Sequence, residues 1–197
     1  MRFCEKVLDI VTVNLLFVVS CLPIVTIGVA KISLYQTIFE VKHSRRIPVF
    51  KIYIRAFKQN LKLGFQLGLL ELGIFLISVI DLSLFWSQTG VAFQLIKAIC
   101  LGILIFLTLV MLASYPIAAR YELTWKEVLQ KGLLLVSFNF VWFFLMLAII
   151  LLIIMLLYLS GFTLVLGGSA FLLFGFGLLA FCQAGLMEKL FAKYQAD

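Results

Sequence analysis

Long uncharged apolar runs dominate the chain. They cover Asn14 to Gly28, Leu63 to Ile80 (interrupted by Glu71), Ala98 to Ala119, Gly132 to Leu159 and Phe162 to Met187. The last four are each close to or above the roughly 18 residues that a helix needs to cross the hydrocarbon of a bilayer. A β-barrel would show short alternating segments instead. The pattern therefore predicts an all-α, polytopic membrane helix bundle of about five hydrophobic segments in a single domain, residues 1–197.

Composition supports this class. Hydrophobic residues make up 64% of the 197, charged residues make up 13%, and the mean hydropathy is +1.20. A soluble domain carries about 25% charged residues. The lipid bilayer is thus the first predicted partner of the chain.

Basic residues cluster in two connections. Seven lie before the second run and three lie between the third and fourth runs: Lys42, Arg45, Arg46, Lys51, Arg55, Lys58 and Lys62, then Arg120, Lys126 and Lys131. The positive-inside rule places residues 42–62 and 120–131 in the cytoplasm. This predicts a multi-pass protein of the cell membrane with a cytoplasmic C-terminus. Since these cations lie next to spans, they do not indicate a nucleic-acid partner.

The first apolar run lies within a longer, mostly apolar segment, Val7 to Val41, that is too long for one straight span. Val7 to Val41 is 35 residues, which would extend about 52 Å as a helix. Pro23 and Gly28 predict a break between two short helices. One outcome is a re-entrant hairpin with both ends in the cytoplasm, and the other is a single kinked span with the N-terminus outside.

The break itself has two interpretations. Non-helical backbone at membrane depth is tolerated where protein or water satisfies it, so we expect the break to be buried. Broken helices line substrate and ion sites in transporters. In the simpler interpretation, the proline kinks a span and Ser20 or Thr26 satisfies the freed carbonyl.

Three stretches resemble a known family. The segments "NLLFVVSCLPIVTIGVAKISLYQ", "FKIYIRAFKQNLKLG" and "SYPIAARYELTWKEVLQKG" are similar to the signature regions of the YesL-like family of small bacterial membrane proteins. Members of that family lie mostly beside genes for carbohydrate ABC importers. The resemblance implies a membrane accessory in sugar uptake, with permease subunits of the importer as partners, and it implies no catalytic residues.

The first basic connection contains an amphipathic pattern. An apolar stripe and a basic stripe repeat at i, i+4, i+7 and i+11, one residue apart: Phe50, Ile54, Phe57 and Leu61, then Lys51, Arg55, Lys58 and Lys62. This spacing predicts one cytoplasmic helix. It either lies flat at the lipid interface or docks on another subunit. In the second connection, Thr124 and Glu127 have the spacing of a capping box, which predicts a helix that begins at Trp125 and runs into the fourth span.

Glu71 is a carboxylate inside an apolar run. It lies about 13 Å beyond Lys62 at helical rise, near the middle of the bilayer. An ionised group there needs a partner, water or a proton. Lys31 is the candidate partner at that depth, with Asn14, Asn139 and Gln183 as further hydrogen-bond donors. The pair would either hold the first segment against the bundle or form a proton or substrate site.

The sequence lacks the residues that several kinds of catalytic and metal site require. The single histidine, His43, excludes a His-based catalytic triad, and the four cysteines show no metal-binding spacing. We therefore expect no cofactor, no metal and no enzymatic activity. Two functions stay open: an accessory of a carbohydrate ABC importer, in which Gly167, Gly168, Gly175 and Gly177 permit close helix contact or self-association, and a small independent transporter with its site at the broken helix and Glu71.

Overall fold

The computed structural model describes residues 2–44, 48–88 and 90–195, and within them the chain is helical with no strand. The helices are α1 (Arg2–Ser20), α2 (Ile27–His43), α3 (Val49–Gln59), α4 (Leu61–Phe85), α5 (Val91–Arg120), α6 (Trp125–Phe138), α7 (Phe140–Leu157), α8 (Gly161–Ala170) and α9 (Phe176–Gln195). A 3-10 turn, η1 (Ile24–Thr26), precedes α2, and a π-helical turn, η2 (Phe171–Gly175), joins α8 to α9. Arg45 and Arg46 of the predicted basic connection lie outside the described residues. The predicted membrane helix bundle is confirmed.

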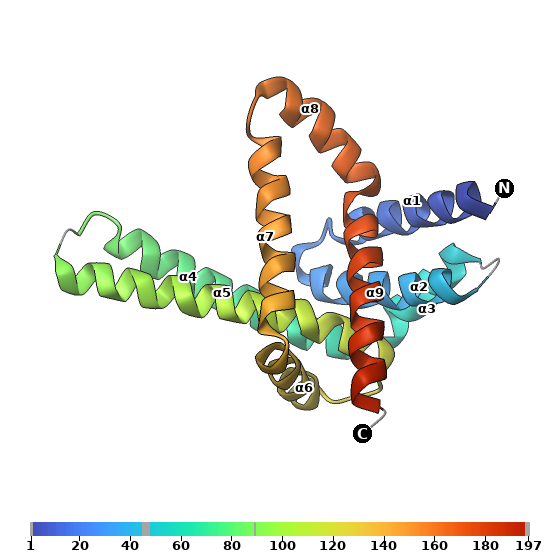
Figure 1. The fold of residues 1–197 in the computed structure, drawn as a ribbon, viewed down its shortest axis with the longest axis horizontal. Coiled ribbons are helices and arrows are strands. Elements are labelled where there is room, and N and C mark those ends of the chain that lie inside the picture. The colour runs from blue at the N-terminus through green and yellow to red at the C-terminus, as the bar shows by residue number, and fades with distance from the viewer. Residues whose placement is uncertain (1, 45–47, 89, 196–197) are drawn as a thin grey trace.

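The elements form two hairpins that diverge from a common base (Figure 1). α4 and α5 run side by side and project away from the other helices, while α7 and the α8–α9 helix rise in a different direction. α1, α2 and α3 lie beside the base of both hairpins, and α6 lies below α7. The basic connections therefore gather at the base.

α2 is the centre of the fold. It contacts α1, α3, α4, α5 and α9, and residues on all sides of it are buried, among them Val29, Ile32, Thr37 and Val41. α5 shows a contrast along its length, because its buried residues begin at Leu109 and continue to Ala118. The protein core therefore lies around α2 and the second half of α5, and the projecting part of the α4–α5 hairpin is left to lipid.

α1 and α2 form an antiparallel hairpin. Lys6 Nζ lies 3.5 Å from the Lys42 carbonyl oxygen, which places the start of α1 beside the end of α2. The alternative of a single kinked span is wrong. The helices contain 19 and 17 residues, about 28 and 26 Å at 1.5 Å per residue, so neither is as short as the sequence suggested.

The break lies where Pro23 predicts it, but it is not buried. Leu22 and Ile24 are 77% and 63% exposed, which contradicts the expectation of a buried break. Thr26 Oγ1 donates to the carbonyls of Ser20, at 2.7 Å, and Pro23, at 2.8 Å. The hydroxyl has one proton, which these two carbonyls share, and the Thr26 amide also donates to the Pro23 oxygen at 3.0 Å. One local residue thus satisfies both carbonyls, and no covering protein is needed.

Gly28 has a different role from the predicted one. It lies inside α2, not in the break, and no described glycine has a positive φ. A Cβ at Gly28 would lie 2.2 Å from the Gly64 carbonyl oxygen and 2.7 Å from the Gly68 Cα. Gly28 therefore lets α2 and α4 approach at backbone distance, as small residues do in membrane helix pairs. The Gly64-xxx-Gly68 spacing is the signal that sequence reasoning missed.

α6 begins as predicted. Thr124 and Glu127 form both halves of a capping box, and the helix starts at Trp125. The Thr124 amide donates to Glu127 Oε2 at 2.8 Å, and this hydrogen bond lowers the pKa of the Glu127 carboxyl. The helix does not continue into the fourth span, because it ends at Phe138 and a new helix starts after Asn139. The predicted Gly132–Leu159 segment is thus divided between two helices.

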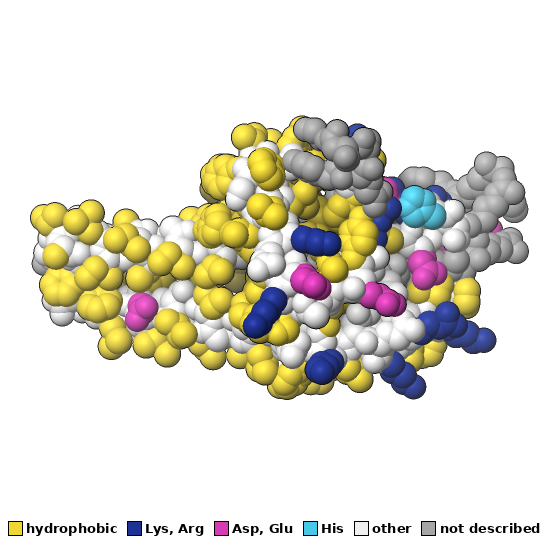
Figure 2. All heavy atoms as spheres, turned by 90° about the horizontal axis from the view of Figure 1, so that it is seen from below, with side chains coloured by type: hydrophobic (Ala, Val, Ile, Leu, Met, Phe, Trp, Pro, Cys, Tyr) yellow, Lys and Arg dark blue, Asp and Glu magenta, His cyan; other side chains and the backbone are white. Residues whose placement is uncertain are grey.

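The exterior of the hairpins is apolar. Five helical stretches in the described residues are long and apolar enough to cross a membrane: Ile24–His43, Leu61–Phe85, Val91–Arg120, Phe140–Leu157 and Leu164–Ala192. On the face that Figure 2 shows, hydrophobic side chains predominate along the projecting α4–α5 arm, and this face of the arm carries an acidic group but no Lys or Arg, while most charged side chains gather over the base. This separation indicates a multi-pass membrane protein that contacts the lipid bilayer.

Candidate functional site

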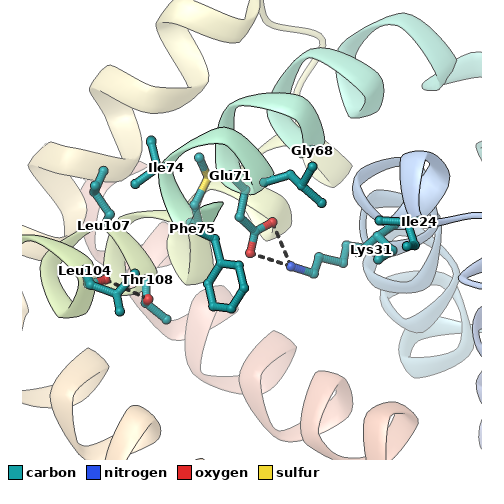
Figure 3. A pocket seen from close by; sticks show the side chains of 12 residues that line it. Ile24, Lys31, Gly68, Glu71, Ile74, Phe75, Leu104, Leu107 and Thr108 are labelled. Carbon is teal, nitrogen blue, oxygen red and sulfur yellow. Dashed lines mark hydrogen bonds and ion pairs between the residues drawn. The ribbon is translucent and has the colours of Figure 1, made fainter. Parts of the chain in front are cut away.

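Glu71 and Lys31 form an ion pair between α4 and α2. Lys31 Nζ lies 2.7 Å from Glu71 Oε1 and 2.8 Å from Oε2, so the pairing expected from depth is confirmed. Figure 3 shows the two side chains extended toward each other from facing helices. The close glycine contact between the same helices lies beside them and brings the two backbones within reach of this pair.

Tyr115 completes the site and was missed by sequence reasoning. Its hydroxyl donates to Glu71 Oε2, and its ring lies 4.7 Å from Lys31 Nζ, in the range of a cation–π contact. Each carboxylate oxygen of Glu71 therefore accepts at least one hydrogen bond. The sequence does mark Tyr115 as a polar side chain within an apolar run, next to Pro116. Its partner could not be predicted from the sequence, because that partner depends on how α5 packs against α4.

Cavities lie on two sides of the pair. One, of about 330 Å³, is lined by Lys31 and Glu71 together with residues of η1, α4 and α5 such as Phe75 and Thr108 (Figure 3). The other, of about 470 Å³, lies among α2, α5, α7 and α9 and is lined by the same pair and by Tyr35. The side chains of Lys31 and Glu71 are 29% and 34% exposed. The pair is thus reachable from the cavities, and its charges are not fully enclosed by this chain.

Gln183 lines the second cavity and bonds to α5 where a proline interrupts its hydrogen-bond ladder. Pro116 lacks an N–H group, so the Leu112 carbonyl loses its helical donor. Gln183 Nε2 donates to that oxygen at 2.6 Å, and Tyr35 Oη donates to Gln183 Oε1 at 2.6 Å. Gln183 therefore connects α9 to α5 and α2 beside the ion pair. It does not bind Glu71, so the expectation that it would donate a hydrogen bond to that carboxylate is wrong.

Asn14 is not part of this site. Its side chain donates to the Leu172 carbonyl at 2.6 Å and accepts from the Gly177 amide at 2.8 Å. Both groups belong to the π-helical turn and the start of α9, where the wider turn disrupts the regular hydrogen-bond ladder. The predicted membership of Asn14 in the Glu71 site is wrong, because Asn14 instead fixes α1 to the irregular part of the last span. The other predicted donor, Asn139, follows the end of α6 and donates to the Leu135 carbonyl of that helix at 3.2 Å.

The glycines of the last span differ in their surroundings. A Cβ at Gly177 would lie 3.0 Å from the Ile10 carbonyl oxygen, so this glycine permits close contact with α1. Cβ atoms at Gly167 and Gly175 would meet side chains of Leu157 and Phe171, and one at Gly168 would meet nothing within 4 Å. Gly177 is thus the one among these four that faces a neighbouring backbone.

α3 is an amphipathic helix, but its buried face is shifted from the predicted one. Val49, Tyr53 and Ala56 are buried, whereas Phe50 and Leu61 of the predicted apolar stripe are 61% and 48% exposed. The prediction of one helix for both stripes is wrong, because α3 ends at Gln59 and the last member of each stripe belongs to α4. The other residues of that stripe, Ile54 and Phe57, are half-buried, and all members of the predicted basic stripe are exposed: Lys51, Arg55, Lys58 and Lys62. The helix packs on α1 and α2 with one face and leaves a basic face and part of an apolar face open.

Comparison with known proteins gives a family match in the first part of the chain. Residues 10–82 match the family "Protein of unknown function, DUF624". The YesL-like proteins belong to DUF624, so the resemblance stated from the sequence is confirmed over residues 10–82. The third of its three segments, residues 114–132, lies outside the match. Neither the curated proteins nor the solved structures that were searched contained a match. The DUF624 region includes α2, the break, α3 and both members of the ion pair.

Proposed function

We propose that this protein is a non-catalytic accessory protein of a carbohydrate ABC-type importer, located in the cell membrane with its C-terminus in the cytoplasm. The observation that best supports this proposal is that both carboxylate oxygens of Glu71 accept hydrogen bonds within the protein. Lys31 bonds both carboxylate oxygens and Tyr115 bonds one of them. A carboxylate held in this way serves to join α4, α2 and α5, and it is a poor carrier of protons or substrate. The importer itself is proposed from the resemblance to YesL-like proteins.

A second candidate is a small independent transporter. The two cavities beside the ion pair favour it, because about a third of each charged side chain is open to them. A charged group at mid-depth needs water, a ligand or protein around it. In this alternative, a substrate would displace Lys31 or Tyr115 from Glu71 as it enters.

Association with an importer is tested by co-purification. The full chain carrying an affinity tag is expressed in its own host and isolated in a mild detergent, and the co-purifying proteins are identified by mass spectrometry. We expect permease subunits of a carbohydrate importer at a constant ratio to the tagged chain. An unrelated polytopic membrane protein with the same tag is the control. Recovery of the chain alone as one monodisperse species, with uptake activity after reconstitution, would replace the accessory proposal by the transporter.

A further inference from the structure

A groove of about 1000 Å³ lies at the basic ends of α4 and α5. It is lined by the start of α4, the end of α5, the first turn of α6, and Gln36 of α2. The membrane-crossing stretches Leu61–Phe85 and Val91–Arg120 begin and end at this groove. It therefore lies at the level of the lipid headgroups, on the side to which the positive-inside rule assigns the cytoplasm.

The groove carries three cations: Lys62, Arg120 and Lys126. The ion pairs among the described residues are Lys31–Glu71, Lys42–Glu188 and His43–Glu188, and none of them uses these three. Glu122 and Glu127 also line the groove, but Glu127 accepts a hydrogen bond from the Thr124 amide as part of the capping box. Positive charge therefore exceeds negative charge, and one of the two carboxylates is already engaged.

Uncharged donors accompany the cations. Asn60 Nδ2 donates to Gln36 Oε1 at 2.9 Å. The Gln36 side chain can therefore donate through its amide nitrogen to an acceptor in the groove. Gln66 and Trp125 also line the groove, and the Trp125 ring lies 5.5 Å from Lys126 Nζ. Cations combined with amides suit a phosphate ester that also carries hydroxyl groups.

An apolar stripe runs along α4 next to the face that lines the groove, although its residues do not themselves line the groove. Leu61, Phe65 and Leu69 follow one another at four-residue intervals, so they form one stripe on the helix. They are 48%, 43% and 48% exposed, and the stripe begins beside Lys62 and continues into the span. A soluble phosphate ester would have no use for this stripe, whereas an acyl chain would cover it.

We propose that this groove binds the headgroup of an anionic phospholipid with a hydroxylated head, such as phosphatidylglycerol. Lys62, Arg120 and Lys126 bind the phosphate, the amides bind the head hydroxyls, and one acyl chain lies on the Leu61–Phe65–Leu69 stripe. Basic pockets between membrane helices on the cytoplasmic side bind anionic headgroups in this way. The proposal is independent of the importer and of transport.

Native mass spectrometry of the full chain in mild detergent tests the site. The protein is given equal amounts of phosphatidylglycerol and phosphatidylcholine, and the ratio of the retained lipids is measured. Each cation near a phosphate contributes about fivefold in affinity. We therefore expect Lys62→Gln with Lys126→Gln to lower the preference for phosphatidylglycerol about 25-fold, and Lys126→Gln alone to lower it about fivefold.

The matched control is Lys51→Gln with Lys58→Gln. It removes the same charge from exposed positions on α3 that do not line the groove, and we expect the wild-type preference to persist. Equal losses in the two double variants would show diffuse surface attraction and overturn the proposal, as would unchanged preference in both. In a last experiment, glycerol phosphate is added at millimolar concentration to the lipid-bound protein. We expect it to leave the lipid in place, and displacement of the lipid would show that the groove recognises a soluble phosphate ester instead.

Discussion

At the scale of single residues, two polar side chains of the bundle, Glu71 and Asn14, have their partners on other helices. Glu71 joins α4 to α2 and α5 through Lys31 and Tyr115, and Asn14 joins α1 to the start of α9. In a bilayer, water is absent as an alternative partner, so a polar side chain that loses its partner is costly. These residues therefore act as cross-links of the fold, whatever else the site does.

The Glu71 pair predicts a defined pattern of stability. Glu71→Gln leaves the Lys31 ammonium without its countercharge, and breaking a buried pair on one side costs about 3–5 kcal/mol. We expect a loss of stability at the lower end of this range, since about a third of each side chain is open to the cavities. Glu71→Gln with Lys31→Met removes both charges and should recover most of the loss. Thermal unfolding in detergent measures each variant.

The same series separates the two functions. In the accessory proposal, the single variant loses stability and the double variant regains it. A transporter would behave differently, because Glu71→Gln would stay folded but lose uptake, and Lys31→Met would not restore it. A stable, inactive single variant would therefore contradict the structural role of the pair and favour a proton or substrate site.

At the scale of elements, the arrangement depends on one close helix crossing. α2 and α4 approach through Gly28, Gly64 and Gly68, where a Cβ on Gly28 would meet backbone atoms and not flexible side chains. Without strong hydrophobic attraction between helices in lipid, close packing is a main source of association. This crossing also sets the separation that the Lys31–Glu71 pair spans.

We predict opposite effects for two alanine substitutions. Gly28→Ala should destabilise the protein by about 1–3 kcal/mol, because α2 and α4 must separate to accept the methyl group. Gly73 lies further along α4, with nothing within 4 Å of an added Cβ. Gly73→Ala should therefore be neutral or stabilise by up to about 1 kcal/mol through helix propensity. Unfolding midpoints in a mild detergent compare the two, and equal shifts would show that the glycine contact is unimportant.

At the scale of the whole molecule, charge and apolar surface are separated. The hairpins α4–α5 and α7–α9 extend from one base, where α3, α6 and the basic residues gather (Figures 1 and 2). The connections at their far ends, between Phe85 and Val91 and between Leu157 and Gly161, contain no Lys or Arg. The base should face the cytoplasm, with the far connections on the opposite side.

Cysteine labelling tests this orientation. In a chain whose four native cysteines are replaced by alanine, single cysteines are placed at Ser44, Gln88 and Gln130, and a membrane-impermeant reagent is applied to intact cells. We expect Gln88→Cys to be labelled from outside, and Ser44→Cys and Gln130→Cys to react after the membrane is opened. Labelling of Ser44→Cys and Gln88→Cys from the same side would contradict the topology.

The sequence by itself determined the class of the protein, the break at Pro23, the start of α6 and the partner of Glu71. These follow from local quantities: apolar run length, the missing proline N–H, capping-box spacing, and depth counted along a helix. Tertiary structure alone decided that Gly28 faces Gly64 and Gly68, that Tyr115 binds Glu71, that Asn14 fixes the π-helical turn, and that α3 buries Tyr53 rather than Phe50. Each of these depends on the rotation of a helix about its own axis against its neighbours. In a chain that is apolar on almost every face, hydrophobic periodicity carries little information about that rotation, because lipid and protein core accept the same side chains.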